Sequence, residues 1–197
     1  MRRSDMADDL LDGWQAVLDQ LGTGAINFTV GLIGGSRECN DRRAVDRLAS
    51  AALAGAAGKG LLVRVNSEVE IDPRRSLRAA KTVEAGPPLT PSPQGPWKET
   101  VVAMRLGLTA PPNLERLPRW LSKWKRDFSR IVIDLGAINL PVCRTIGRYC
   151  DTSFLLLGPN ACAGSQWLRD QLDILSNCHV AVAGSLLITT DADAEAA

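Results

Sequence analysis

The sequence predicts a three-layer α/β/α domain built on a mostly parallel sheet. Apolar runs of strand length alternate with helical apolar patterns along the chain, and glycine or proline separates most of these segments. Strands that alternate with helices favour right-handed crossovers, which place helices on both faces of a parallel sheet. The length of 197 residues suits one hydrophobic core. We therefore expect residues 1–197 to form a single domain.

The first half of the chain is expected to contain two helices and two strands. Helices are indicated where apolar residues recur on one helical face, and strands where short apolar runs rich in β-branched residues end at glycine. The second helix also has a suitable side chain to cap its start. In order, the elements are a helix at 8–21, a strand from Phe28 to Ile33, a helix from Asn40 or Asp41 to about Ala56, and a strand at 61–65.

The second half repeats the alternation after a loop. Residues 86–97 read GPPLTPSPQGPW, and this many prolines exclude regular structure. Residues 190–197 are small and acidic with few apolar groups, so we expect this tail to be disordered. The elements between them are a strand at 100–106, a helix from about Leu114 to Ser129, a strand at 131–135, a helix at 141–149, a strand at 153–157, a helix at 166–175 and a strand at 180–189.

The composition is that of an ordinary globular protein and gives no sign of a nucleic-acid partner. Hydrophobic residues make up 45% and charged residues 23%, and the formal net charge is +1. The five cysteines include no C-x-x-C pair and there is one histidine, so we expect reduced thiols and no metal site. No apolar run approaches the length of a membrane span and no signal peptide is visible, so the expected location is the cytoplasm.

The stretch 26–53 is the centre of the predicted fold, because a strand, a glycine-containing turn and a helix follow one another there. α/β proteins bind phosphate at such a place, since the helix N-terminus offers unpaired N–H groups and the positive end of a dipole. The candidate anion-binding residues are the turn residues Gly35 and Ser36 and the cations Arg42 and Arg43. Cations at a helix start oppose the dipole, so a solvated basic face is the alternative interpretation of the two arginines.

Four fragments, taken in order, resemble one protein family. They are Gly34-Gly35-Ser36-Arg37, GLLVRVN, the APPNLERL of 110–117 and the FSRIVIDLG of 128–136. They are similar to the cytoplasmic domain of bacterial tyrosine autokinases (BY-kinases), which work with chain-length regulators in capsule and exopolysaccharide export. These kinases are deviant-Walker P-loop ATPases, as are the chromosome-partitioning and septum-positioning ATPases. The resemblance spans nearly the whole chain and implies a P-loop NTPase-like fold.

The phosphate loop departs from the family pattern. The pattern S-R-x-G-x-G-K-[ST]-T falls on residues 36–44, where both glycines, the lysine and the magnesium-binding hydroxyl are replaced. Cβ atoms at Cys39 and Asp41 would obstruct a tight anion-binding turn, and the Asp41 carboxylate would repel phosphate. Arg43 cannot coordinate magnesium as serine or threonine does. The loop is therefore expected to have lost its chemistry, with the helix starting near Asn40 or Asp41 under a side-chain cap.

The second motif of the family is altered as well. The pattern I-D-x-D falls on residues 63–66, so Arg64 and Asn66 replace the two carboxylates. Asp134, at the position of the distal Walker aspartate, is the one candidate catalytic residue that remains. An acid that ends a strand before a glycine can equally cap the following turn. The C-terminal tyrosine cluster of the family is also missing, because the single tyrosine is Tyr149.

Together these features favour a catalytically degenerate relative of the kinases, kept as a regulatory or binding module in exopolysaccharide or capsule synthesis and export. No cofactor is expected, and the resemblance implies a protein partner, either a chain-length regulator or an active kinase. Such a partner would bring the protein to the inner face of the plasma membrane, and residues 86–97 are a candidate contact. Two alternatives remain open: an active ATP-binding tyrosine kinase or ATPase with an atypical phosphate loop, which would use ATP with magnesium, and a scaffold of the partitioning-ATPase kind.

Overall fold

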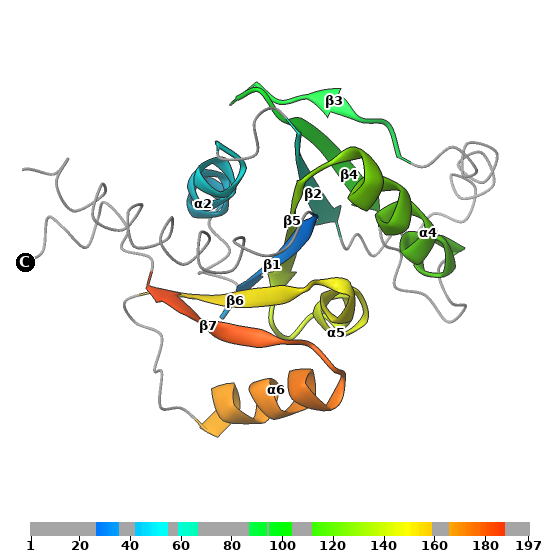
Figure 1. Cartoon of the computed structure of the whole chain (residues 1–197). Helices are drawn as coiled ribbons and strands as arrows, with labels where there is room; N and C mark the ends of the chain where they lie inside the picture. The colour runs from blue at the N-terminus through cyan, green and yellow to red at the C-terminus, as the bar shows by residue number, and fades with distance from the viewer. Residues whose placement is uncertain are drawn as a thin grey trace, which may run out of the picture.

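The computed structural model describes residues 27–35, 42–54, 59–66, 87–93, 95–103, 112–158 and 166–187. These ranges contain seven strands and four α-helices, which alternate along the chain except where β2, β3 and β4 follow one another (Figure 1). In order, they are β1 (Phe28–Gly34), α2 (Arg42–Ala54), β2 (Gly60–Asn66), β3 (Thr90–Pro91), β4 (Lys98–Ala103), α4 (Pro112–Asp127), β5 (Arg130–Ala137), α5 (Pro141–Ile146) with the 3₁₀ turn η2 (Gly147–Tyr149), β6 (Thr152–Leu157), α6 (Gln166–Asn177) and β7 (Val182–Leu187).

The strands form one mostly parallel sheet, as predicted. Their order is β3-β4-β2-β5-β1-β6-β7, and every pairing except that of β3 with β4 is parallel. After β1 the chain passes the position of β5 and enters the sheet as β2. After β5 it runs in the opposite direction, passes β1 and enters the sheet as β6. The carboxyl ends of β1 and β5 therefore meet at a topological switch point, where open α/β sheets bind their ligands.

Two hydrophobic clusters lie on opposite faces of the sheet, which confirms the three-layer architecture. One cluster joins α2 to alternate residues of the central strands, including Val30, Leu32 and Val132. The other joins α4, α5 and α6 to the intervening residues, including Ile33 and Ile133. Period-two alternation along each strand thus divides its side chains between two helical layers. Figure 1 shows α2 on one side of the sheet and α4 and α5 on the other.

One prediction about the proline-rich segment was wrong. Residues 86–97 were expected to exclude regular structure, but Thr90 and Pro91 form β3 and pair antiparallel with Glu99 and Lys98 of β4. Proline is compatible with an edge strand, because its missing N–H can face away from the neighbour. Trp97 at the end of the segment is buried, with 5% of its surface exposed, so the loop is anchored in the core.

The remaining elements agree with the predictions to within a few residues. β4 begins at Lys98, two residues before the predicted start, and α5 ends at Ile146, after which the chain continues as a 3₁₀ turn. The predicted helix at 8–21 and the predicted disordered tail at 190–197 lie outside the described residues. Among the described residues, no helix is long and apolar enough to cross a membrane.

We expect Gly31→Ala to lower the free energy of unfolding by about 1–3 kcal/mol, which is typical of overpacking. A Cβ at Gly31 would lie 2.5 Å from Ser153 Oγ, 2.9 Å from Leu135 Cδ1 and 3.1 Å from Cys150 Sγ. Urea titration followed by circular dichroism measures the effect. The matched control is Gly184→Ala in β7, where a Cβ would meet nothing within 4 Å. Equal stability of the two variants would contradict the packing that we describe around β1.

Candidate functional site

The switch point lies where the turns after β1 and β5 meet. The Ile138 N–H, beyond β5, donates to the Gly34 carbonyl at 2.8 Å, and this bond joins the two turns directly. Gly136 has a positive φ of 71°, a conformation that glycine adopts without steric cost, so the chain can turn sharply after β5. Asp134 of β5 is in register with Leu32 of β1 on one side and with Arg64 of β2 on the other. The candidate site is therefore centred on Asp134.

Gly35 lies at the switch point but its backbone is already engaged. Its N–H donates to the Leu156 carbonyl of β6 at 2.7 Å. A Cβ at this position would lie 2.7 Å from Leu157 Cδ2 and 3.0 Å from the Leu156 carbonyl oxygen. Glycine is thus required here for the close approach of the turn to β6. The Gly35 N–H is not a spare donor for a phosphate.

Asp134 is part of the turn that follows β5. Its Oδ1 accepts a hydrogen bond from the Gly136 N–H at 3.1 Å. A carboxylate that accepts from the backbone two residues later stabilises a turn, and this is the structural role that the sequence offered as the alternative to catalysis. The aspartate is half-buried. This bond gives the acid at residue 134 a structural role, and a catalytic role for Asp134 stays a prediction.

Arg64 is the most unusual residue of the site. It projects from β2 on the α2 face, and its side chain is only 11% exposed. Its Nη2 donates to Asp46 Oδ1 of α2 at 2.6 Å, and Glu99 Oε2 of β4 lies 3.8 Å away. The Ser92 hydroxyl donates to the same Glu99 carboxylate through a short hydrogen bond. One cation from β2 therefore links α2 to β4 across the sheet.

The arginine is incompletely satisfied. Its Nε and Nη1 are buried, and among the residues that the structure describes neither atom has a hydrogen-bond partner. The group has two more negative charges than positive charges. Its acids are Asp46, Glu99 and Asp134, and its cation is Arg64. A buried charge is stable only when it is paired, so the guanidinium and the two carboxylates that contact it depend on one another.

Two buried thiols near the sheet carry no nucleophilic chemistry. Burial, with a smaller contribution from the nearby Asp134 carboxylate, raises the pKa of Cys143 to about 12. Burial likewise raises the pKa of Cys150 to about 12. The Cys143 thiol lies 3.2 Å from the Leu135 carbonyl and 3.1 Å from the Ala137 carbonyl, to which it can donate. Both groups are protonated at neutral pH, and it is the thiolate that reacts.

The structure brings together only part of the predicted site. Gly35 and Asp134 lie at the switch point, whereas Ser36 is outside the described residues. Arg42 and Arg43 form the start of α2, which has no acidic residue in its first turn. The described part of α2 begins at Arg42, and the side-chain cap predicted at Asn40 or Asp41 lies outside the described residues. The positions of the arginine side chains are not described, so the anion site at these four residues stays a prediction.

Sequence reasoning missed the partners of Arg64. Asp46 lies on α2 and Glu99 on β4, 18 and 35 positions away in the chain, and nothing in the local pattern connects them. A usable signal was present in the run LLVRV, because a single charge inside a buried strand requires a buried counter-charge. That argument predicts an acid near Arg64 but cannot say which element supplies it.

The described residues do not fit a magnesium-nucleotide site of the kind that the family resemblance implies. Magnesium is held by carboxylates, hydroxyls and water at near-ideal octahedral geometry. At the end of β2 the chain instead presents the Arg64 guanidinium, which would repel the ion, and Asp46 and Glu99 already contact that guanidinium. Among the described residues, no group of three His, Cys, Asp or Glu side chains could hold a metal ion.

We expect Asp46→Ala to lower the free energy of unfolding by about 3 kcal/mol, because it removes the closest counter-charge of a buried guanidinium. The double variant Asp46→Leu with Arg64→Met should recover most of the loss, since it removes both charges together. Urea titration of the wild type, Asp46→Leu, Arg64→Met and the double variant forms the cycle, with Asp46→Ala measured beside them. A stable Asp46→Ala protein would show that Arg64 does not depend on this carboxylate.

The control for this cycle is an exposed ion pair of the same kind. Lys125 Nζ lies 2.9 Å from Asp151 Oδ1, with 32% and 38% of the side chains exposed. Solvent screens such a pair, so Lys125→Met should cost less than about 1 kcal/mol. A loss as large as that of Asp46→Ala would mean that burial does not distinguish the two pairs.

Comparison with known proteins identifies the fold. No protein-family model matches the sequence, and no curated protein matches it. Among solved structures, the BceF tyrosine kinase domain superimposes with a TM-score of 0.65 at 18% identity, covering 90% of this chain and 75% of its own. The kinase domain of the Escherichia coli tyrosine kinase ETK also gives 0.65, at 13% identity, covering 91% and 74%. The cell division protein MinD of Aquifex aeolicus gives 0.51 at 13% identity, covering 82% and 68%. The chain therefore has the α/β P-loop fold of the bacterial tyrosine kinase domains.

Proposed function

We propose that this protein is a non-catalytic binding or regulatory module of envelope polysaccharide synthesis and export, with the fold of a tyrosine kinase domain but without its phosphoryl-transfer chemistry. The observation that carries the proposal is Arg64. By the family resemblance it stands where the kinases have a carboxylate, and its side chain is buried in ion pairs with Asp46 and Glu99. A kinase needs magnesium and oriented carboxylates at this place to stabilise the transferred phosphoryl group.

Further support comes from how the substitutions are distributed. Five positions that carry chemistry in the family are changed, whereas the strands and helices that build the two cores are intact. The changed positions are Cys39, Asp41, Arg43, Arg64 and Asn66. A fold that keeps its packing and loses its catalytic groups is suited to binding, because function resides in the site and not in the fold.

The partner that we propose is a protein of the same export system, either a chain-length regulator or an active tyrosine kinase. This choice follows the family resemblance and the names of the solved relatives, several of which are tyrosine kinase domains. A contact surface is available at the β3–β4 edge of the sheet, where Leu89 and Val101 are 36% and 54% exposed. Leu89 belongs to the proline-rich segment, and a proline-constrained segment loses less entropy when it binds.

Calorimetric titration with ATP and magnesium tests the loss of nucleotide chemistry. We expect no saturable binding, because Arg64 and its carboxylates leave no place for the ion at the end of β2. Asp134→Asn is the informative variant, since the amide oxygen can still accept from the Gly136 N–H while the charge is lost. Micromolar binding by the wild type that disappears in Asp134→Asn would identify an active nucleotide site and overturn the proposal.

Affinity capture from the source cells tests the proposed partner and surface. The wild-type protein should retrieve a chain-length regulator or a tyrosine kinase, and Leu89→Ser with Val101→Ser should retrieve less of it. Point variants are preferable to replacement of the whole loop, because a Cβ at Gly95 would lie 1.9 Å from the Trp97 ring and Trp97 is buried.

The control for this capture is Trp167→Ser on α6, which removes a 46% exposed apolar side chain at a distance from the β3–β4 edge. If the wild type, the Leu89→Ser/Val101→Ser variant and Trp167→Ser retrieve the same amount of partner, the β3–β4 edge is rejected as the contact surface. The proposed partner would still stand. Retrieval of no envelope-polysaccharide protein by the wild type would reject the partner as well.

A further inference from the structure

The sheet ends at β7, an edge strand that carries no charge. Its six residues are half-buried or exposed, and no charged residue occurs from 180 to 187. Among the residues that the structure describes, no strand pairs with the outer side of β7. Natural edge strands are usually protected by charge, proline, a bulge or a covering segment, because their unpaired N–H and C=O groups can pair with another chain. The outer side of β7 is therefore a candidate site for strand pairing.

The protective feature that β7 does have lies at its start. Its pairing with β6 shifts register between Val182 and Gly184, so that Ala183 is an extra residue. From Gly184 to Leu187 the register is regular. A bulge disturbs strand pairing only locally. The four residues 184–187 are thus suited to pairing with a further strand.

The strand also carries an exposed apolar side chain at its end. Leu187 is 55% exposed. It is in register with Leu157 of β6, which belongs to the hydrophobic cluster on the α6 side of the sheet. Residues in register on neighbouring strands point to the same face, so Leu187 projects on the α6 side.

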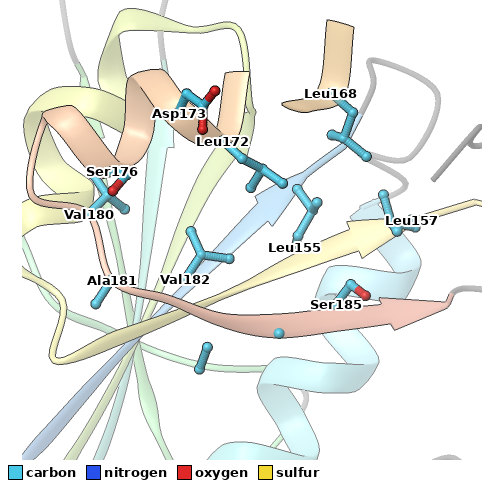
Figure 2. A pocket seen from close by; sticks show the side chains of 12 residues that line it. Leu155, Leu157, Leu168, Leu172, Asp173, Ser176, Val180, Ala181, Val182 and Ser185 are labelled. Carbon is cyan, nitrogen blue, oxygen red and sulfur yellow. The ribbon is translucent and has the colours of Figure 1, made fainter. Parts of the chain in front are cut away.

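An apolar hollow lies on the same face, displaced toward the start of β7. It has a volume of about 650 Å³ and lies between α6 and the strands β6 and β7. Figure 2 shows Leu155 of β6, Leu172 of α6 and Val182 of β7 converging on it, with Leu157 and Ser185 toward one end. Along β7 its lining runs from residue 182 to residue 185, so the exposed leucine lies just beyond it.

The exposed leucine and the hollow are complementary between two copies of the chain. Antiparallel pairing of β7 with the β7 of a second copy follows a two-fold axis perpendicular to the sheet, which keeps the α6 faces of both copies on one side. Because the strands run in opposite directions, Leu187 of each copy then lies beside residues 182–185 of the other copy, where the hollow is. Each copy supplies both the side chain and the hollow, as an isologous interface requires.

The charge of this edge also favours a second copy as the partner. Like charges placed opposite each other in a sheet are destabilising, so an uncharged strand is the kind that can pair with itself. Asp173, the single charged side chain in the lining of the hollow, is exposed on α6. A small apolar molecule fits less well, because it offers no partners to the unpaired backbone groups of β7.

We propose that the protein forms a homodimer in which residues 184–187 of β7 pair antiparallel with the same residues of a second copy. Leu187 of each copy packs in the hollow of the other copy. The pairing joins the two sheets into one and gives the outer backbone groups of both strands a partner. The proposal is independent of the proposed function.

Sedimentation velocity of the full-length protein over a range of concentrations tests the proposal. The wild type should show a monomer–dimer equilibrium. Leu187→Lys should raise the dissociation constant at least roughly tenfold, because it removes an apolar anchor and introduces charge into an apolar interface. The matched control is Val101→Lys, which changes a 54% exposed apolar residue of β4 near the opposite edge of the sheet and should leave the dissociation constant unchanged. Far-UV circular dichroism verifies that both variants are folded.

Three outcomes of this experiment would overturn the proposal. A wild type that is monomeric at every concentration forms no such dimer. A dimer that Leu187→Lys leaves unchanged is held together elsewhere. A dimer that Leu187→Lys and Val101→Lys weaken equally does not depend specifically on β7.

Hydrogen exchange of the wild type provides a test that needs no variant. Peptides covering 182–187 should exchange several-fold more slowly at a concentration at which the dimer dominates than at one at which the monomer dominates. Peptides covering β1, in the interior of the sheet, should show no such dependence. Fast exchange at 182–187 at both concentrations would contradict the pairing. Slow exchange at both concentrations would assign the edge to a segment of the same chain and would also overturn the proposal.

Discussion

The need to cover a parallel sheet on both faces shapes this whole protein. Parallel strands are buried on both sides, so each helix that connects two of them must also protect a face of the sheet. The chain meets this need with α2 on one face and α4, α5 and α6 on the other. The two edges are exceptions. One ends in the short antiparallel strand β3, and the other ends in β7, whose side chains are half-buried or exposed.

The same constraint explains why Arg64 matters. Near the carboxyl end of β2, α2 must contact the face of the sheet that it covers. In this chain that contact is an ion pair. Arg64 reaches Asp46 of α2 and lies near Glu99 of β4, so one guanidinium ties a helix and two strands together. Within the described part of the chain, its buried Nε and Nη1 have no hydrogen-bond partner, so Asp46 and Glu99 provide the polar contacts that the guanidinium makes there.

The sequence predicted the fold well because its signals are local. The apolar run of β1 and the helical spacing of α2 are both visible within a window of about a dozen residues. β3 was missed because two residues with a proline carry no strand pattern, and their pairing with Glu99 and Lys98 is a tertiary contact. The partners of Arg64 were missed for the same reason. The structural role of Asp134 was offered as an alternative, and the Gly136 N–H now gives it a concrete form.

The residues that specify this fold and the residues that would give it chemistry are largely separate. Leu32 and Ile133 are buried in the sheet and determine its packing, whereas Arg64 near the end of β2 is not a member of either hydrophobic cluster. Stability therefore does not oppose the loss of a phosphate loop, provided that each newly buried charge acquires a partner. Asp46 supplies that partner for Arg64. The separation explains how one fold can be kept while the residues at the ends of its strands differ between proteins.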